Sequence, residues 1–281
     1  MRGKAEIVAS MLIWGSVGIF SRLSGLSGLG VAFARVSLGS MVLLPALLFR
    51  GKLKKAFETL MERKLSALLL GLVLALNWVF LFTAFNRTTI ANAVLVYYLS
   101  PVMATLMSWR FLGESIGRRW MLIGMAFTGF LIIALGNGFD VGSKDFQGVI
   151  LALIAGFFYA MIPNLGRAMR DVDGEVLTFL QLALASLFLL PFVLFLPVGK
   201  PVPWAVAILV LVHTVLALYI YMDGLKKVEV NEVALLSYLD PLSAVVYAFL
   251  VFGEVPTLET AIGGALILLA SAMDVVLARG P

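Results

Sequence analysis

The sequence predicts an all-α membrane protein of ten transmembrane helices, arranged as two inverted five-helix repeats with both termini in the cytoplasm. Composition is the first indication: 62% of the 281 residues are hydrophobic, 13% are charged, and the mean hydropathy is +1.04. A soluble chain of this size needs far more polar surface. The apolar residues also form separate runs, and the two halves of the chain resemble each other.

Clusters of charge separate apolar runs of about 20 residues, and a helix of that length, at about 1.5 Å per residue, crosses a hydrocarbon core of about 30 Å. The runs are continuous rather than alternating, and they are too long for barrel strands. Helices also satisfy their own backbone groups in lipid. We therefore expect transmembrane helices at residues 5–22, 28–49, 64–85, 90–112, 117–136, 147–167, 174–196, 203–225, 231–252 and 257–278.

An internal duplication divides the chain into two repeats, which we place at residues 1–140 and 141–281. Residues 33–49 align without a gap to residues 179–195 with eight identities in 17 positions, whereas chance in segments this apolar gives roughly two. A second ungapped match pairs residues 98–114 with residues 238–254, and both segments begin Tyr-Leu-x-Pro and end Gly-Glu.

The odd number of spans in each repeat requires inversion, because the second repeat must enter the membrane from the side opposite to the first. Of the 21 lysines and arginines, 16 lie at the termini and in the loops after the second, fourth, sixth and eighth spans, and four lie in the remaining loops. Cytoplasmic loops carry the excess of positive charge. We therefore expect a multi-pass protein of the plasma or inner membrane with both termini cytoplasmic.

Several function classes are disfavoured. The net charge of +5 does not indicate nucleic-acid binding, because the cations lie at helix ends on one side, where topology and anionic lipid explain them. The absence of cysteine excludes disulfides and thiolate metal sites. The start at residues 1–4 is similar to a signal peptide, but cleavage would leave the first repeat incomplete, so we expect the segment to be retained.

Membrane transport is the function that this arrangement favours. Inverted repeats typically place a substrate site between the repeats near the bilayer midplane, and exchange of the two half-conformations gives alternating access. The sequence has no Gly-rich phosphate loop followed by Lys-Ser or Lys-Thr. We therefore expect passive or gradient-coupled transport, with no catalytic residues, cofactor or metal.

Three motifs occur in a fixed order along the chain. They are a Pro-centred helix ending in Gly-Glu, present as Pro101–Glu114 and Pro241–Glu254, the glycines that follow (Gly124, Gly129, Gly263, Gly264), and Trp14-Gly15-Ser16 near the start. Together they resemble the EamA repeat of the drug/metabolite transporter superfamily over essentially the whole chain. This resemblance implies a secondary transporter, often an exporter of amino acids or other small metabolites, with a central cavity lined by helices 1, 3, 4, 6, 8 and 9. It implies neither one invariant substrate site nor an oligomeric state.

Asp240 is the leading candidate for substrate or proton binding. It lies deep in the ninth predicted span, where an ionised carboxylate costs at least a few kcal/mol unless it is paired, hydrated or protonated. Its repeat counterpart is neutral Ser100. A structural bond to a nearby hydroxyl or amide is the alternative. Proton coupling is thus a hypothesis that rests on one residue.

Other polar and aromatic residues within the expected cavity helices complete the candidate set. His213 is the only histidine; a relay role suits its pKa near 6.5, and a hydrogen-bonded interior residue is the alternative. Aromatic walls with a few directed hydrogen bonds suit a small amphipathic or cationic solute. The candidate substrate cavity comprises Trp14, Asn77, Tyr98, Ser100, Tyr159, His213, Tyr238 and Asp240.

A second set is expected to serve structure or movement. Pro101 and Pro241 are candidate hinges, because each removes a helical hydrogen bond near the middle of its span. Arg35 can snorkel towards the headgroups with a structural hydrogen-bonding role, and its repeat partner Gln181 is also polar, which hints at a shared inward-facing position. Two further residues, Glu114 and Glu254, are expected to brace the start of the next helix.

Two alternatives from other function classes stay open. A lipid-processing intramembrane protein would need paired acids or a His/Asp cluster on facing helices, and one histidine and one deep acid are a thin basis for that. A membrane sensor or scaffold on the same fold is the other alternative, since fold does not determine function. Flux of a small-molecule substrate separates the three.

Overall fold

The computed structural model of the protein describes residues 2–113, 119–136, 140–166, 169–225, 227–228 and 230–277. These residues form helices and no β-strand; one isolated bridge joins Leu26 to Gly199. Eight helical segments are long and apolar enough to cross a membrane, and two shorter apolar helices, Trp120–Gly136 and Leu239–Phe252, accompany them. The all-helical membrane fold predicted from composition is confirmed.

The helices follow the predicted spans closely, and several spans consist of two consecutive helices. In chain order they are α1 (Arg2–Gly15), α2 (Val17–Leu23), α3 (Gly28–Phe49), α4 (Leu53–Glu62), α5 (Lys64–Phe85), α6 (Ile90–Tyr97), α7 (Ser100–Leu112), α8 (Trp120–Gly136), α9 (Lys144–Gly166), α10 (Gly174–Phe195), α11 (Pro203–Val210), the π-helix η3 (Leu211–Leu216), α12 (Ala217–Leu225), α13 (Val230–Leu236), α14 (Leu239–Phe252) and α15 (Leu258–Leu277).

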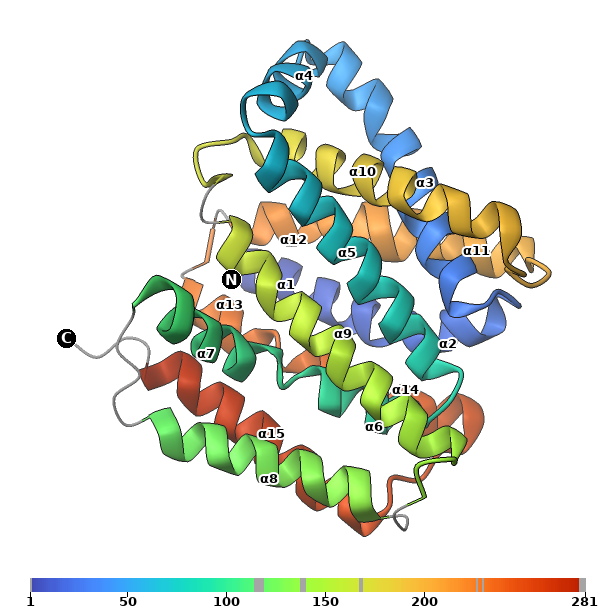
Figure 1. The fold of residues 1–281 in the computed structure, drawn as a ribbon, viewed down its shortest axis with the longest axis vertical. Coiled ribbons are helices and arrows are strands. Elements are labelled where there is room, and N and C mark those ends of the chain that lie inside the picture. Colours follow the sequence, from blue (N-terminus) through green and yellow to red (C-terminus); the bar gives the residue numbers. More distant parts are fainter. Residues whose placement is uncertain are drawn as a thin grey trace.

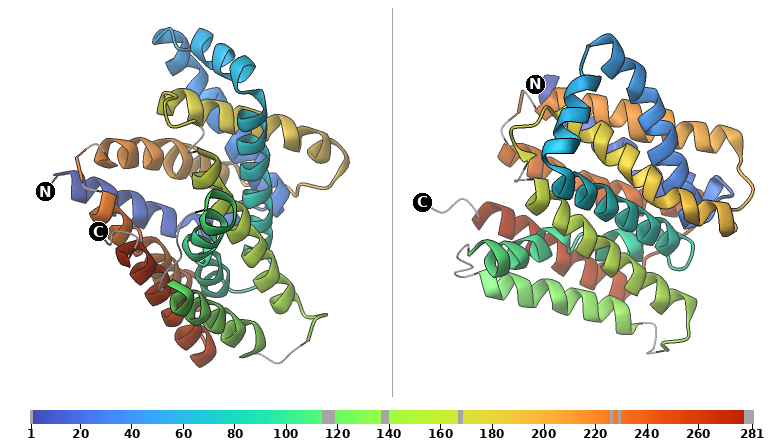
Figure 2. Two further views of the ribbon diagram at one scale, coloured as in Figure 1. Left: turned by 60° about the vertical axis from the view of Figure 1, so that its left-hand side comes forward. Right: turned by 45° about the horizontal axis from the view of Figure 1, so that its top comes forward.

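Helices that are equivalent in the two repeats pack against each other at the flanks of the molecule. α3 lies beside α10 at one flank, and α8 lies beside α15 at the other (Figure 1). Between them α1 packs on α12 and α14, while α9 packs on α5, α6 and α7. The turned views show the same order of layers (Figure 2). The centre of the molecule is therefore built from both repeats.

Small residues allow the flanking helices to approach closely. A Cβ added at Gly129 of α8 would lie 2.4 Å from the Gly263 carbonyl oxygen of α15, and one at Gly263 would lie 2.5 Å from the Gly129 oxygen. Gly124 has open space instead. Contacts of this kind drive helix association in lipid, where no hydrophobic effect operates between helices. Gly129 and Gly263 thus fix the α8–α15 crossing.

Several of the spans that reach the centre are interrupted. The first span breaks at Ser16, the α6–α7 span at residues 98–99, and the α13–α14 span at residues 237–238. Pro101 is the second residue of α7 and Pro241 the third of α14, where a missing amide is tolerated. The kinks expected at these prolines are therefore complete breaks just before them. A hinge role stays a prediction.

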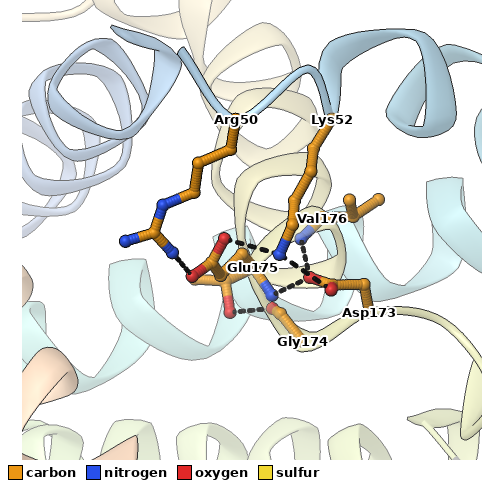
Figure 3. Close-up of polar contacts among 7 residues, drawn as sticks. Arg50, Lys52, Asp173, Gly174, Glu175 and Val176 are labelled. Carbon is orange, nitrogen blue, oxygen red and sulfur yellow. Dashed lines mark hydrogen bonds and ion pairs between the residues drawn. The ribbon is translucent and has the colours of Figure 1, made fainter. Parts of the chain in front are cut away.

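Successive long helices run in opposite directions, so the loops between them gather at two ends of the molecule. We call the end with the start of α1, the α3–α4 loop and the α9–α10 loop the amino-terminal face, and the other end the opposite face. At the amino-terminal face, Lys52 Nζ lies 2.9 Å from Asp173 and 2.8 Å from Glu175, and Arg50 also pairs with Glu175 (Figure 3). Asp173 caps α10 by accepting from the Glu175 amide at 2.9 Å. This cluster joins the first repeat to the second.

The ionic cluster shifts the pKa values of both its acidic and its basic members. The hydrogen bond from Lys52 holds the pKa of Asp173 below its usual range. Hydrogen bonds to Glu175 and then Asp173 raise the pKa of Lys52. The cluster is exposed enough that water and salt screen it, so its contribution to stability is modest.

A denser clamp closes the opposite face. Arg22, at the end of α2, donates from Nε to the Phe85 carbonyl at 2.6 Å and from Nη2 to the Thr88 carbonyl at 2.7 Å, and it pairs with Glu254 through Nη1. The other Glu254 oxygen accepts from the Ile90 amide at 2.9 Å, at the first residue of α6. The clamp therefore ties α2, the α5–α6 loop, α6 and the end of α14 together.

The expectation for Glu254 needs correction. We expected its carboxylate to brace the following helix, which is α15, but it caps α6 of the other repeat. The positive end of a helix attracts a carboxylate whichever segment supplies it. Glu114 lies outside the described residues.

Candidate functional site

A cavity of about 320 Å³ lies at the centre of the molecule, between the two repeats. Its walls come from α1, α2, α3, α5 and α6 of the first repeat and from α9, α10, η3, α12 and α14 of the second. The lining is largely apolar with a few polar side chains, which is typical of small-molecule sites. The polar and aromatic lining residues are Trp14, Arg35, Trp78, Phe85, Tyr97, Tyr98, Tyr159, Thr178, Gln181, His213, Thr214 and Asp240.

Asp240 supplies the negative charge of the cavity. It is the second residue of α14, directly after the helix break, and its Oδ2 accepts a hydrogen bond from the Tyr98 hydroxyl at 2.8 Å. Tyr98 itself sits at the break between α6 and α7. Among the described residues no lysine or arginine lies within ion-pair distance of Asp240. The two helix breaks thus meet through one carboxylate, which has no counter-ion in the described part of the chain.

A glycine lets α1 pass directly over this acid. A Cβ at Gly15 would lie 2.0 Å from Ser243 Oγ and 2.9 Å from the Asp240 carbonyl oxygen. On the other repeat, a Cβ at Gly156 of α9 would lie 3.0 Å from the Tyr97 carbonyl oxygen. Each helix break is therefore covered by a glycine from the first helix of the other repeat.

Arg35 supplies the positive charge. Its side chain is only 5% exposed, so the expectation that it snorkels to the headgroups is wrong. Nε donates to Thr214 Oγ1 at 2.9 Å, and the guanidinium carbon lies 4.2 Å from the centre of the Trp78 ring. The predicted hydrogen-bonding role is present, but the residue also lines the cavity. Partners on η3 hold the guanidinium there because the π-helical turn frees a carbonyl.

That carbonyl belongs to His213, which accepts from Trp14 Nε1 at 2.9 Å and from Arg35 Nη2 at 3.4 Å. The imidazole is 1% exposed, donates from Nδ1 to the Ile208 carbonyl at 3.1 Å, and meets Ser16 Oγ through Nε2 at 2.8 Å. Both ring nitrogens therefore have protein partners. The geometry favours the hydrogen-bonded interior residue over the proton relay. π-Helical turns are frequent at functional sites.

The cavity is sealed towards one face. Val17, Phe85, Val94 and Ala244 line it and are each at most 8% exposed, and the Arg22–Glu254 clamp lies beyond them. Tyr159 and Met222 are 45% and 40% exposed, in the halves of α9 and α12 nearer the amino-terminal face. The cavity therefore opens on the amino-terminal side.

The predicted cavity residues separate into two groups. Trp14, Tyr98, Tyr159, His213 and Asp240 line the cavity. Asn77, Ser100 and Tyr238 do not.

The three residues that miss the cavity serve packing instead. Asn77 is fully buried between α5 and α9, where it donates to the Ala155 carbonyl at 2.8 Å, and Ser100 is 3% exposed. The ring of Tyr238 lies 6.1 Å from that of Tyr98. Polarity within a span does not reveal which neighbour the residue faces.

Arg35 and Gln181 are the opposite case, because both line the cavity although we predicted a structural role. The signal was present in the sequence: the duplication pairs them, and two polar residues at one repeat position suggest a shared inward direction. Thr178 and Thr214 also line the cavity, and their sequence positions carried no such signal.

A central cavity between two repeats, closed at one face and open at the other, defines a multi-pass membrane transporter fold. The EamA-like transporter family matches twice, over residues 2–135 and 146–275. The chain belongs to this family, which confirms the resemblance, and the family consists of transporters rather than enzymes.

Relatives agree with this assignment. An uncharacterized transporter of Archaeoglobus fulgidus is 32% identical over 92% of this chain and 92% of its own. YxxF of Bacillus subtilis, also named an uncharacterized transporter, is 29% identical over 98% of this chain and 90% of its own. The aromatic amino acid exporter YddG of Ancylobacter novellus is 29% identical over 71% of this chain and 72% of its own.

A solved crystal structure has the same fold, with a TM-score of 0.63 over 99% of this chain and 97% of its own, at 24% identity.

Proposed function

We propose that the protein is a secondary exporter that moves a small, amphipathic, amino-acid-like metabolite through the central cavity by alternating access. The proposal includes ten transmembrane helices, inverted repeats at residues 1–140 and 141–281, and both termini in the cytoplasm. The observation that carries it is an amphipathic cavity of about 320 Å³ between the repeats, with one carboxylate and one guanidinium on its walls. This volume is at the small end of ligand pockets.

The direction of loading follows from the proposed orientation. With the amino-terminal face in the cytoplasm, the open side of the cavity faces the cytoplasm and the Arg22–Glu254 clamp closes the outer face. An exporter loads its substrate in this state. Similarity to an aromatic amino acid exporter supports an amino-acid-like solute, and the Tyr97, Tyr98 and Trp78 rings supply suitable walls.

Asp240 is the proposed coupling acid. It lines the cavity, has Tyr98 as its only hydrogen-bonding side chain among the described residues, and can exchange a proton or a substrate amine as the cavity changes access. Proton coupling predicts that an inward proton gradient drives export and that the Asp240→Asn variant loses this dependence.

The test is flux of radiolabelled amino acids and quaternary amines in proteoliposomes, with protein-free liposomes as the control. We expect saturable flux of at least one solute, accelerated by a proton gradient and reduced at least about tenfold in Asp240→Asn. Flux in that variant equal to that of the natural protein at every pH would remove the coupling role. Saturable binding without flux of any solute would favour a membrane sensor.

A further inference from the structure

Arg35 has no counter-ion among the residues that the structure describes. It is 5% exposed within α3, and no carboxylate lies within ion-pair distance of it among the described residues. Three other partly enclosed cations pair with acids: Arg119 with Asp274, Arg22 with Glu254, and Lys52 with Asp173 and Glu175. A charge inside a membrane protein that is unpaired is expensive, and such residues mark substrate pathways.

The guanidinium is also held in one orientation. Nε and Nη2 donate to Thr214 Oγ1 and the His213 carbonyl, and the plane lies against the rings of Trp78 and Phe82 at 4.2 Å and 5.3 Å. Nη1 has no hydrogen-bond partner among the described residues, and Arg35 lines the cavity. The side chain is thus fixed by its neighbours and keeps a donor for a ligand.

From this geometry we propose that Arg35 binds a carboxylate of the transported solute. This inference rests on the proposed function and names the substrate class: a solute with a carboxylate for Arg35 and a cationic amine for Asp240. Arg35 and Asp240 leave the cavity neutral overall, so a zwitterion pairs both charges, whereas a phosphate dianion would leave a net negative charge. Arginine suits carboxylates because its donors are fixed and it remains charged.

Matched analogues test this proposal by titration calorimetry on the purified full-length protein. Each set contains a zwitterion, the acid without the amine, and the amine without the acid: phenylalanine, hydrocinnamate and phenethylamine in one, leucine, isocaproate and isoamylamine in the other. We expect carboxylate-bearing members of at least one set to bind more tightly than the amine. In Arg35→Gln their affinity should fall about tenfold or more and this preference should vanish.

Two variants keep the result interpretable. Arg87→Gln makes the same change at the α5–α6 turn, outside the cavity, and should leave binding unchanged. Arg35→Lys keeps the charge without the planar fork, so it should bind the acids more weakly than the natural protein while the amine is unaffected. If Arg35→Gln does not fold, unchanged acid affinity in Arg35→Lys overturns the proposal.

Other outcomes also decide. No carboxylate binding in either set, acid preference retained in Arg35→Gln, or complete displacement of the acids by equimolar chloride would each overturn the assignment. Flux in proteoliposomes is measured separately. Carboxylate binding that depends on Arg35, without any flux, supports the binding site and contradicts the exporter. Flux that is the same in Arg35→Gln as in the natural protein supports the exporter and contradicts the binding site.

Discussion

The breaks at α6–α7 and α13–α14 share a sequence and a geometry but not a chemistry. Both carry Tyr-Leu-x-Pro, both interrupt a span, and both are covered by a glycine from the other repeat. Yet Ser100 is 3% exposed and does not line the cavity, whereas Asp240 lines it and accepts a hydrogen bond from the Tyr98 hydroxyl. Duplication preserved the broken backbone, and only one copy carries the charge.

The largest effect should come from exchanging the two residues. In the Ser100→Asp/Asp240→Ser double variant the acid moves to a packed position without a cavity, where burial of the charge costs several kcal/mol. We expect flux to fall at least about tenfold and thermal stability to drop. Ser100→Ala is the control and should be nearly neutral. Flux equal to that of the natural protein would show that the two breaks are interchangeable.

The glycines above the two breaks should differ in sensitivity. Gly15→Ala places a Cβ 2.0 Å from Ser243 Oγ and 2.9 Å from backbone oxygen, so we expect a loss of about 1–3 kcal/mol of stability. Gly156→Ala meets one carbonyl oxygen at 3.0 Å and should lose less. Gly124→Ala, in open space, should be neutral or slightly stabilising. Thermal unfolding in detergent ranks the three, and equal effects would contradict the geometry.

Loosening the Arg22–Glu254 clamp should change access rather than fold. Glu254→Gln removes the ion pair and keeps an acceptor for the Ile90 amide, so the face that the clamp closes should open more often. Because the chain has no cysteine, a cysteine introduced by Val94→Cys is the one thiol that a maleimide can label. We expect an impermeant maleimide to label it about threefold faster or more. Equal rates in Glu254→Gln and a Glu58→Gln control would exclude a closing role.

The smallest effect concerns the exposed cluster at the amino-terminal face. The lowered pKa of Asp173 means that its contribution is present above about pH 4 and is lost as pH falls through the folded-state value. Lys52→Gln should therefore reduce the loss of thermal stability on acidification, by about 1–2 °C or less. An unchanged acid profile would show that the cluster contributes nothing measurable.

The sequence predicted the helices better than it predicted the site. Span positions follow from hydropathy and length. Asp240 stood out because an ionised carboxylate within an apolar span is costly unless it has a functional or structural role. Asn77 and Arg35 were misplaced because facing depends on which helix packs beside each residue, which hydropathy does not encode. The π-helical turn at residues 211–216 was also unpredictable, since nothing in Leu211–Leu216 marks a change of hydrogen-bond register.

The π-helical turn of η3 also decides which backbone group is free to bind side chains. An α-helical turn joins each amide to the carbonyl four residues back, whereas a π-helical turn joins it to the carbonyl five residues back, so one carbonyl is left without a backbone partner. The His213 carbonyl accepts instead from Trp14 and Arg35. Deleting Val212 would restore a plain helix and return a backbone amide to that carbonyl, so Trp14 and Arg35 would lose their shared acceptor although neither had been replaced.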